Sequence, residues 1–434
     1  MPGLASHDAA ALDLETAPSV TPAAWHRTER FQLALRCFFA AFVVYAQRTS
    51  LALAIVRMQS KLGWSRHIQG LVLAAFFGGY MVSQLPSGWL AARFGARRCV
   101  GLALLVSSLI SLALPVCATA SPAAVVVARV VQGLAQGVVF PGMAALWANW
   151  SPPLERSRLQ GSGQTGGYAG AMVCNVLAGA QCDWPSLPLL GGWQGVFVLW
   201  GLVGAGCSAY WWATVGDTPE QCARCSAAER AFISERLAAE RDRAQRQHSS
   251  TSSTAPGSDT GGDTGGAPAE PLSARRLYGH IVCSAPCWAI ALAHTAYDCA
   301  SYTLEDGMPA FLRDVLGFEL ATIGVLLAIP GALRPPLLLC AAALADRMIR
   351  RRGAGRVRKG FTVAALVPQA LFLLGVGAAL LRAPAAIVSL LAVVVPLSTI
   401  ALGGGYAANH LDIAPTVASF VRSETRTPNW IHAV

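Results

Sequence analysis

Charged residues are scarce in this chain, and the shortage limits what kind of protein it can be. Of its 434 residues, 13% are charged and 54% are hydrophobic, whereas about a quarter of the residues in soluble domains are charged. The mean hydropathy is +0.47. This composition argues against a soluble enzyme and predicts an all-α polytopic membrane protein.

Other absences narrow the class further. The twelve cysteines lie mostly singly in apolar stretches, so we expect no disulfide framework. Cys222-Ala-Arg-Cys225 has no second ligand pair nearby, and we expect no metal there. No nucleophile–base constellation stands out, which predicts neither an enzyme nor a cofactor. Residues 1–30 contain no apolar core, so no cleavable signal peptide is expected.

Ten apolar stretches are long enough to be membrane-spanning helices. They lie at about 33–56, 68–91, 98–118, 122–148, 160–182, 194–215, 281–304, 319–345, 360–381 and 384–408. Between the sixth and the seventh, Ser226-Ala-Ala-Glu229 is a capping box that predicts a short charged helix to about Arg246. Residues 248–271 are rich in Ser, Thr, Gly and Pro, which predicts a disordered linker.

The cations are distributed unevenly between alternate loops. The N-terminal tail, loops 2–3, 4–5 and 8–9 and the central linker hold 22 Arg and Lys residues, whereas the opposite loops hold five. This bias predicts a cytosolic N-terminus and linker, and it explains the net charge of +10 without nucleic acid. The sequon Asn149-Trp-Ser151 is then cytosolic and unglycosylated.

An internal echo predicts two related halves. The basic motif from Gly88 to Arg98 closes the second apolar stretch, and a similar motif from Ala342 to Arg351 closes the eighth. The expected organisation is an N-terminal tail (1–30), a six-helix half (31–216), a linker (217–280), a four-helix half (281–420) and a divergent tail (421–434).

Two arginines interrupt the apolar stretches. Arg48 lies in the first stretch and Arg129 in the fourth. An ionised guanidinium within a bilayer-spanning helix faces the bundle interior or a watery cavity, and there it commonly binds a ligand. The guanidinium fork matches a carboxylate or a phosphate, so an anionic substrate is expected. The alternative is that each arginine forms a structural ion pair within the bundle.

Several motifs resemble the anion–cation symporters of the major facilitator superfamily. The resemblance covers most of residues 35–416. Its motifs are Gly79–Gly88, Ala128–Pro141, Trp150–Leu159, Ala293–Tyr302 and Asn409–Pro415. Members of this family carry two more helices after the last motif, whereas the residues from Arg422 to Val434 are too short and polar to span a membrane. We therefore expect a major facilitator fold whose last two of twelve helices are missing.

The resemblance implies roles for residues of each half. The candidate substrate-binding residues are Arg48, Arg129, Tyr80, Gln136, Gln164, Tyr168, His294, Tyr302 and Asn409. The candidate gating residues are Gly88, Arg93, Arg97, Asp346 and Arg347. For Tyr80, Gln84, Gln164, Tyr168 and Asn175, hydrogen bonding between helices is the alternative role.

The chain also departs from the family pattern. Gln136 stands where members that carry glutamate or sialic acid have a glutamate, so a proton cannot be taken up at that position. Leu73 replaces a histidine of the glutamate carriers, which argues against glutamate, and Ala92 replaces an aspartate of the loop 2–3 motif.

Glu305, Asp306 and Arg334 have no counterpart in the family. Asp298, Glu305 and Asp306 are coupling candidates, but Met308-Pro309 favours a helix end that places Glu305 and Asp306 in the outer interface. Arg334 is either a third anion contact or a residue that snorkels to the outer interface.

The sequence therefore predicts a secondary active transporter that moves an organic anion or phosphate by alternating access. Its energy would come from an H⁺ or Na⁺ gradient or from the membrane potential, worth about 2.3 kcal/mol per charge per 100 mV. A lysosomal or vesicular membrane and the plasma membrane are both compatible with the sequence. The rival interpretation is a truncated, non-transporting membrane protein.

Overall fold

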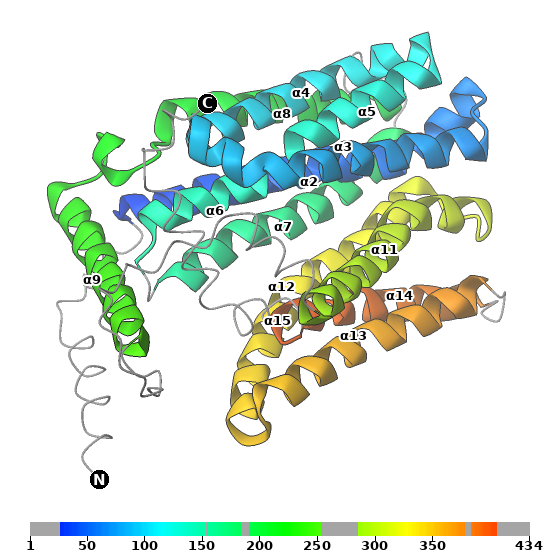
Figure 1. Ribbon diagram of the computed structural model, residues 1–434. Coiled ribbons are helices and arrows are strands. Elements are labelled where there is room, and N and C mark those ends of the chain that lie inside the picture. The colour runs from blue at the N-terminus through cyan, green and yellow to red at the C-terminus, as the bar shows by residue number, and fades with distance from the viewer. Residues whose placement is uncertain (1–26, 153–154, 184–190, 253–284, 378–382, 406–434) are drawn as a thin grey trace, which may run out of the picture.

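The computed structural model describes residues 27–152, 155–183, 191–252, 285–377 and 383–405, and helices dominate these ranges (Figure 1). The long helices are α2 (Glu29–Leu62), α3 (Arg66–Phe94), α4 (Ala96–Ala120), α7 (Arg156–Asp183), α8 (Gly192–Thr214), α11 (Ala285–Asp314), α12 (Leu320–Arg352) and α13 (Ala354–Gly377). Two further rods are each broken once, into α5 (Pro122–Gln136) and α6 (Val139–Trp150), and into α14 (Pro384–Ser398) and α15 (Ile400–Gly403). The linker contributes the short 3₁₀ helix η2 (Pro219–Gln221) and α9 (Ala227–Ser252).

The ten rods confirm the predicted all-α architecture of about ten helices. Seven of them are long and apolar enough to cross a membrane, and α3 adds an eighth although it bends by 59° near Pro86. In the described ranges α7 and α11 are not among these, because their sequences carry more polar residues. Both helices lie where the two halves of the molecule meet, which is where polar side chains avoid lipid.

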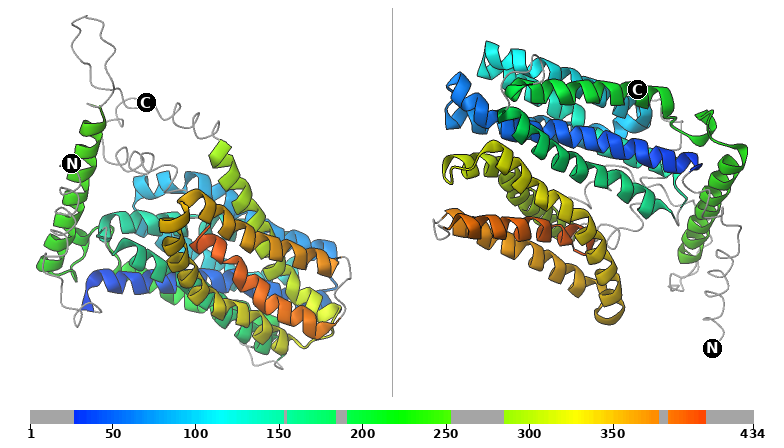
Figure 2. Two further views of the ribbon diagram at one scale, coloured as in Figure 1. Left: turned by 90° about the horizontal axis from the view of Figure 1, so that it is seen from below. Right: turned by 180° about the vertical axis from the view of Figure 1, so that it is seen from behind.

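The helices form two groups. Helices α2 to α8 lie together, and α11 to α15 form the second group, as both views in Figure 2 show. The two basic motifs that echo each other lie at the ends of α3 and α12, the second long helix of each group.

Glycines let the helices of the first group pack closely. A Cβ atom on Gly133 of α5 would lie 2.0 Å from the carbonyl oxygen of Phe76 on α3, and one on Gly79 of α3 would lie 2.0 Å from that of Val130. No side chain larger than hydrogen fits at these crossings. The crossing therefore holds Phe76 next to the second half of α5.

The linker helix α9 is attached to the beginning of α2. Ser226 accepts a hydrogen bond from the backbone N–H of Glu229 at 3.1 Å, which forms the predicted N-cap. The Glu229 carboxylate then accepts from the backbone N–H groups of Glu29 and Arg30 at 2.9 and 3.1 Å. An anionic side chain at a helix N-terminus satisfies unpaired donors and the helix dipole. Helix α9 extends to Ser252, into the predicted disordered linker, whose remainder lies outside the described residues.

The two groups meet at the end opposite α9 and diverge toward it (Figure 1). At the closed end, a Cβ atom on Gly324 of α12 would lie 2.3 Å from the carbonyl oxygen of Asn175 on α7. Asp183 of α7 pairs with Arg57 and accepts a hydrogen bond from the backbone N–H of Ala321 at 3.2 Å. Close helix crossing and helix capping together seal this end.

One predicted helix boundary is wrong. The sequence favoured an end of the seventh span near residue 304, but α11 continues through Pro309 to Asp314. A proline removes the backbone hydrogen bond that its missing N–H would have made and crowds the carbonyl group one turn earlier, but neighbouring helices can hold the helix together across it. Glu305 and Asp306 consequently lie inside the helix and not past its end in the outer interface.

Candidate anion-binding site

Arg48 lies on the inner side of α2 in a cage of aromatic rings. Its side chain is 6% exposed, and its Nη2 atom has no hydrogen-bond partner among the described residues. Its Cζ atom lies 4.2 to 5.6 Å from the ring centroids of Tyr302, Phe77, Phe76, Tyr80 and Tyr45. Ring faces carry partial negative charge and stabilise a desolvated cation. The cage thus holds a guanidinium out of water without neutralising it.

Arg129 of α5 lies close to the same phenylalanine ring. It is 2% exposed, its Nη1 atom donates to the side-chain oxygen of Gln132 at 2.7 Å, and its Cζ atom lies 4.7 Å from the Phe76 ring centroid. Because the Cζ atom of Arg48 lies 5.0 Å from that centroid, the two cations are at most about 10 Å apart. A single small anion, or one end of a larger one, can therefore interact with both.

Neither guanidinium forms an ion pair with a carboxylate of the described residues, taking 4.0 Å between nitrogen and oxygen as the limit. Asp306 of α11 interacts electrostatically with both Arg48 and Arg129 from beyond that distance. The alternative that these arginines serve as structural ion-pair partners is thus not what the described part of the chain shows.

A hydrogen-bonded network of uncharged side chains includes Gln132, the partner of Arg129. Gln132, which accepts from Arg129, donates to Ser111 at 3.1 Å. Gln136 donates to Ser107 at 2.6 Å, and Ser107 in turn donates to Gln47 at 2.6 Å. All five side chains are buried. Gln136, a candidate substrate contact, therefore contributes to packing between α4 and α5 in this conformation.

Helix α11 supplies the wall opposite the arginines. The Tyr302 ring lies 4.8 Å from that of Phe77, so this candidate residue contacts the cage directly. Asp298 and His294 lie one and two turns before Tyr302 on the same helix. They form an ion pair at 2.9 Å, and the side chains of His294 and Asp298 are partly exposed, at 52% and 34%. Of these three candidates on α11, Tyr302 is the one that touches the Arg48 guanidinium.

A second buried cationic group, Arg334, lies on α12. Arg334 is buried and forms an ion pair with Glu305, and its Cζ atom lies 5.6 Å from the ring centroid of Tyr168. The interpretation that Arg334 snorkels to the outer interface is therefore wrong, because a snorkelling side chain keeps its charged head in water. The candidate residues Glu305 and Tyr168 therefore lie next to Arg334.

The candidate gating residues lie apart from these arginines. Arg97 donates its backbone N–H to Asp217 at 2.7 Å and its guanidinium to the carbonyl oxygen of Trp212. Arg93 and Arg347 are exposed, and a Cβ atom on Gly88 would meet open space. The side chains of Asp346 and Gln164 and the whole of Asn409 lie outside the described residues.

Sequence reasoning missed the aromatic cage. Phe76 and Phe77 lie in an apolar run of α3, where nothing in the sequence distinguishes them from lipid-facing residues. A signal was available in Gly79 and Gly133, whose helical neighbours must approach another helix closely. That approach is what brings Phe76 to Arg129.

A family model described as the Major Facilitator Superfamily matches residues 37–425. The chain belongs to this superfamily. Sialin of Ovis aries is 29% identical over 450 residues, covering 95% of this chain and 83% of sialin, and sialin of Homo sapiens is 28% identical over 434 residues, covering 92% and 79%. Vesicular glutamate transporter 1 of Xenopus laevis is 28% identical over 409 residues, covering 90% and 65%. The predicted resemblance to the anion–cation symporters is confirmed, and so is the expectation of a membrane transporter that is not an enzyme.

Solved structures of the superfamily share the fold. A bacterial homolog of the human lysosomal transporter Spinster, in an inward-facing and unoccupied conformation, has a TM-score of 0.66 at 15% identity, covering 93% of this chain and 79% of that one. The xylose transporter XylE of E. coli, partially occluded and inward open, has a TM-score of 0.61 at 11% identity, covering 91% and 88%.

Proposed function

We propose that this protein is a secondary active transporter that moves an organic anion or phosphate by alternating access. The observation that carries the proposal is the pair of buried guanidiniums, Arg48 and Arg129, which both lie against the Phe76 ring and form no ion pair with a carboxylate in the described part of the chain. Vesicular glutamate transporter 1, to which the chain is similar, is named for an anionic substrate.

The energetics favour an anion at this place. Removing a charge from water is unfavourable by several kcal/mol unless the charge is paired and hydrogen-bonded. Each ring around Arg48 offsets about 0.5–2 kcal/mol of this desolvation cost, and the Nη2 atom of Arg48 still has no hydrogen-bond acceptor among the described residues. An anion that visits the site would supply the missing charge and the missing acceptors together, so binding and stabilisation coincide.

The closed end of the molecule suggests which step of the cycle this conformation represents. The halves are sealed at the end opposite α9 by Asp183 and Gly324 and diverge toward α9. With a cytosolic linker, as the distribution of cations predicts, this is an inward-facing state. The substrate would then leave or enter between the two helix groups on the cytosolic side.

In this proposal, transport is driven by a proton or sodium gradient or by the membrane potential. Asp306 is the carboxylate that we assign to coupling, because it interacts electrostatically with both Arg48 and Arg129 and so competes with an anion for them. Glu305 is already held by Arg334 and contributes less. A cation bound to Asp306, most simply a proton, would remove that competition. The compatible locations are lysosomal or vesicular membranes and the plasma membrane.

The test is uptake into proteoliposomes across a panel of sialate, glutamate, urate, ATP and phosphate, with pH, sodium and voltage varied separately. Arg129→Ala should lower uptake of the transported anion at least tenfold, because a hydrogen-bonded charge contributes about 1.5–3 kcal/mol. Arg224→Ala removes an exposed linker arginine and is the matched control. Wild-type uptake by correctly inserted Arg129→Ala protein would refute the role of Arg129.

A further inference from the structure

Basic residues gather where α12 ends and α13 begins, a segment that we call the α12–α13 tip (residues 347–359). Asp346 is the one acidic residue of the sequence between positions 320 and 411. A single residue, Gly353, separates the two helices, and its φ of +80° is a conformation that glycine adopts readily. This tight turn brings the basic ends of both helices together (Figure 1). The basic residues of the tip are Arg347, Arg350, Arg351, Arg352, Arg356, Arg358 and Lys359.

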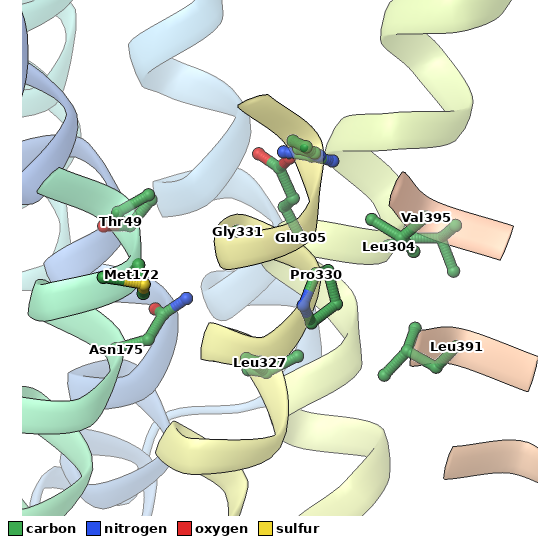
Figure 3. Close-up of a pocket in the computed structure, with 12 residues that line it drawn as sticks. Thr49, Met172, Asn175, Leu304, Glu305, Leu327, Pro330, Gly331, Leu391 and Val395 are labelled. Carbon is green, nitrogen blue, oxygen red and sulfur yellow. The ribbon is translucent and has the colours of Figure 1, made fainter. Parts of the chain in front are cut away.

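The exposed cations of the tip form no ion pair within the described part of the chain; they are Arg347, Arg351, Arg352, Arg356 and Lys359. The buried cation of the same helix differs, because Arg334 pairs with Glu305, which lines a small cavity between the two helix groups (Figure 3). The related basic motif at the end of α3 also has an acidic neighbour, since Asp217 accepts a hydrogen bond from the backbone N–H of Arg97 at 2.7 Å. The tip therefore presents positive charge that the described residues do not neutralise.

The cations of α13 occupy the unfavourable end of their helix. Arg356, Arg358 and Lys359 lie in its first two turns, and its first turn contains no acidic residue. The N-terminus of a helix carries partial positive charge, which repels basic side chains and attracts anions. An anion bound at the tip would offset both this repulsion and the repulsion among the basic side chains themselves.

The tip also lies where two apolar spans end. These spans are Leu320–Ile349 and Gly355–Val376, so each cation of the tip is within about one helical turn of a span end. Farther into the spans, Leu344 of α12 and Val363 of α13 are exposed apolar side chains. A cluster of cations at the membrane surface above apolar side chains matches a lipid, with its charged headgroup above its acyl chains. With the orientation that the distribution of cations predicts, the tip would face the cytosolic leaflet.

We propose that the α12–α13 tip binds a membrane lipid whose headgroup carries two or more phosphates. The exposed guanidiniums would bind the phosphates through charge-assisted hydrogen bonds, and the acyl chains would lie along Leu344 and Val363. A headgroup with several phosphates can contact the ends of α12 and α13 at the same time, whereas a headgroup with a single charge cannot. This binding is separate from the proposed transport of an anion between the helix groups and does not require it.

The test measures lipid binding to the purified protein in a neutral detergent, through the rise in unfolding temperature that a bound ligand causes. The three probes are dioctanoyl phosphatidylinositol bisphosphate, dioctanoyl phosphatidylserine and inositol trisphosphate, which is a headgroup without acyl chains. The bisphosphate lipid should bind about tenfold or more tightly than either of the others, because each additional basic residue that an anionic lipid engages strengthens binding about fivefold. Its affinity should fall as the salt concentration is raised.

Two triple variants separate a defined site from a general effect of charge. Replacement of Arg351, Arg356 and Lys359 by Gln should weaken binding of the bisphosphate lipid about 100-fold, which is three fivefold steps. The matched control replaces three other exposed arginines by Gln and lowers the net charge equally; these are Arg27, Arg98 and Arg224. The control should bind the lipid within about threefold of wild type. Both variants should unfold at the wild-type temperature without lipid, because the replaced side chains are exposed.

Three results would overturn the lipid site. Equal weakening in the two triple variants would mean that net charge, and no defined site, attracts the lipid. Equal binding of the bisphosphate lipid and phosphatidylserine would contradict a headgroup that contacts both helix ends. Equal binding of inositol trisphosphate would make the ligand a soluble polyphosphate and not a lipid. Since no transported anion enters these measurements, each of these results would leave the proposed function standing.

Discussion

The contacts of Asp183 at the closed end of the molecule predict how much a substitution there favours opening. Helix α12 has no capping side chain of its own at Glu319, and Asp183 of α7 takes that role by accepting the backbone N–H of Ala321 at 3.2 Å. Capping side chains contribute about 0.5–2 kcal/mol. The ion pair of Asp183 with Arg57, whose side chains are 27% and 32% exposed, adds about 0.2–1 kcal/mol. Only the cap depends on contact between α7 and α12, because Arg57 of α2 and Asp183 of α7 both belong to the first helix group.

Asp183→Ala should therefore favour opening of this end by about 0.5–2 kcal/mol, which corresponds to a change of about 2- to 30-fold in the equilibrium between closed and open states. The measurement is amide hydrogen exchange in the first turn of α12, where protection reports the free energy of opening. Arg57→Gln removes the ion pair and leaves the cap, so its effect should be several-fold smaller. Unchanged protection in Asp183→Ala, or an equal loss in Arg57→Gln, would refute the assignment of the cap as the main contribution.

Two more substitutions test how the site is supported. Gly133→Ala should lower the stability of the protein by about 1–3 kcal/mol in thermal unfolding, because its Cβ would lie 2.0 Å from the Phe76 carbonyl oxygen. Gly78→Ala is the control and should leave stability unchanged, because a Cβ at Gly78 meets open space. Equal effects of the two substitutions would contradict the close crossing of α3 and α5. Glu229→Ala should loosen α9, and since burial first and the Glu229 carboxylate second raise the pKa of the Cys225 thiol to about 12, alkylation of Cys225 at pH 8 should be faster in this variant. An unchanged alkylation rate would show that Glu229 does not hold the linker in place.

The spans were predictable because hydropathy acts on whole helices, and the two motif arginines were predictable because a charge in such a span is unusual. The cage around Arg48 was not, because it gathers rings from α2, α3 and α11, which come together only in the fold. The end of α11 was misjudged for a similar reason. Pro309 is a local signal, whereas the packing that carries the helix past it is tertiary.

Arg334 and Glu229 illustrate a further limit. Both are charged residues whose partners lie 29 and about 200 residues away, so no spacing rule connects them. The sequence left two interpretations of Arg334 open, and the burial of its guanidinium decides against one of them.

The side chains hydrogen-bonded around Arg129 are uncharged, and this matters for function. A carboxylate at the position of Gln132 or Gln136 would compensate the buried charge of Arg129, which single glutamines cannot do. It would also occupy the guanidinium permanently and lower its affinity for any visiting anion. Amide and hydroxyl groups hold the side chain in place with hydrogen bonds while its charge stays uncompensated. An arrangement of this kind is less favourable for the folded protein alone than a fixed ion pair would be, and it becomes favourable when the cargo itself is the counter-ion.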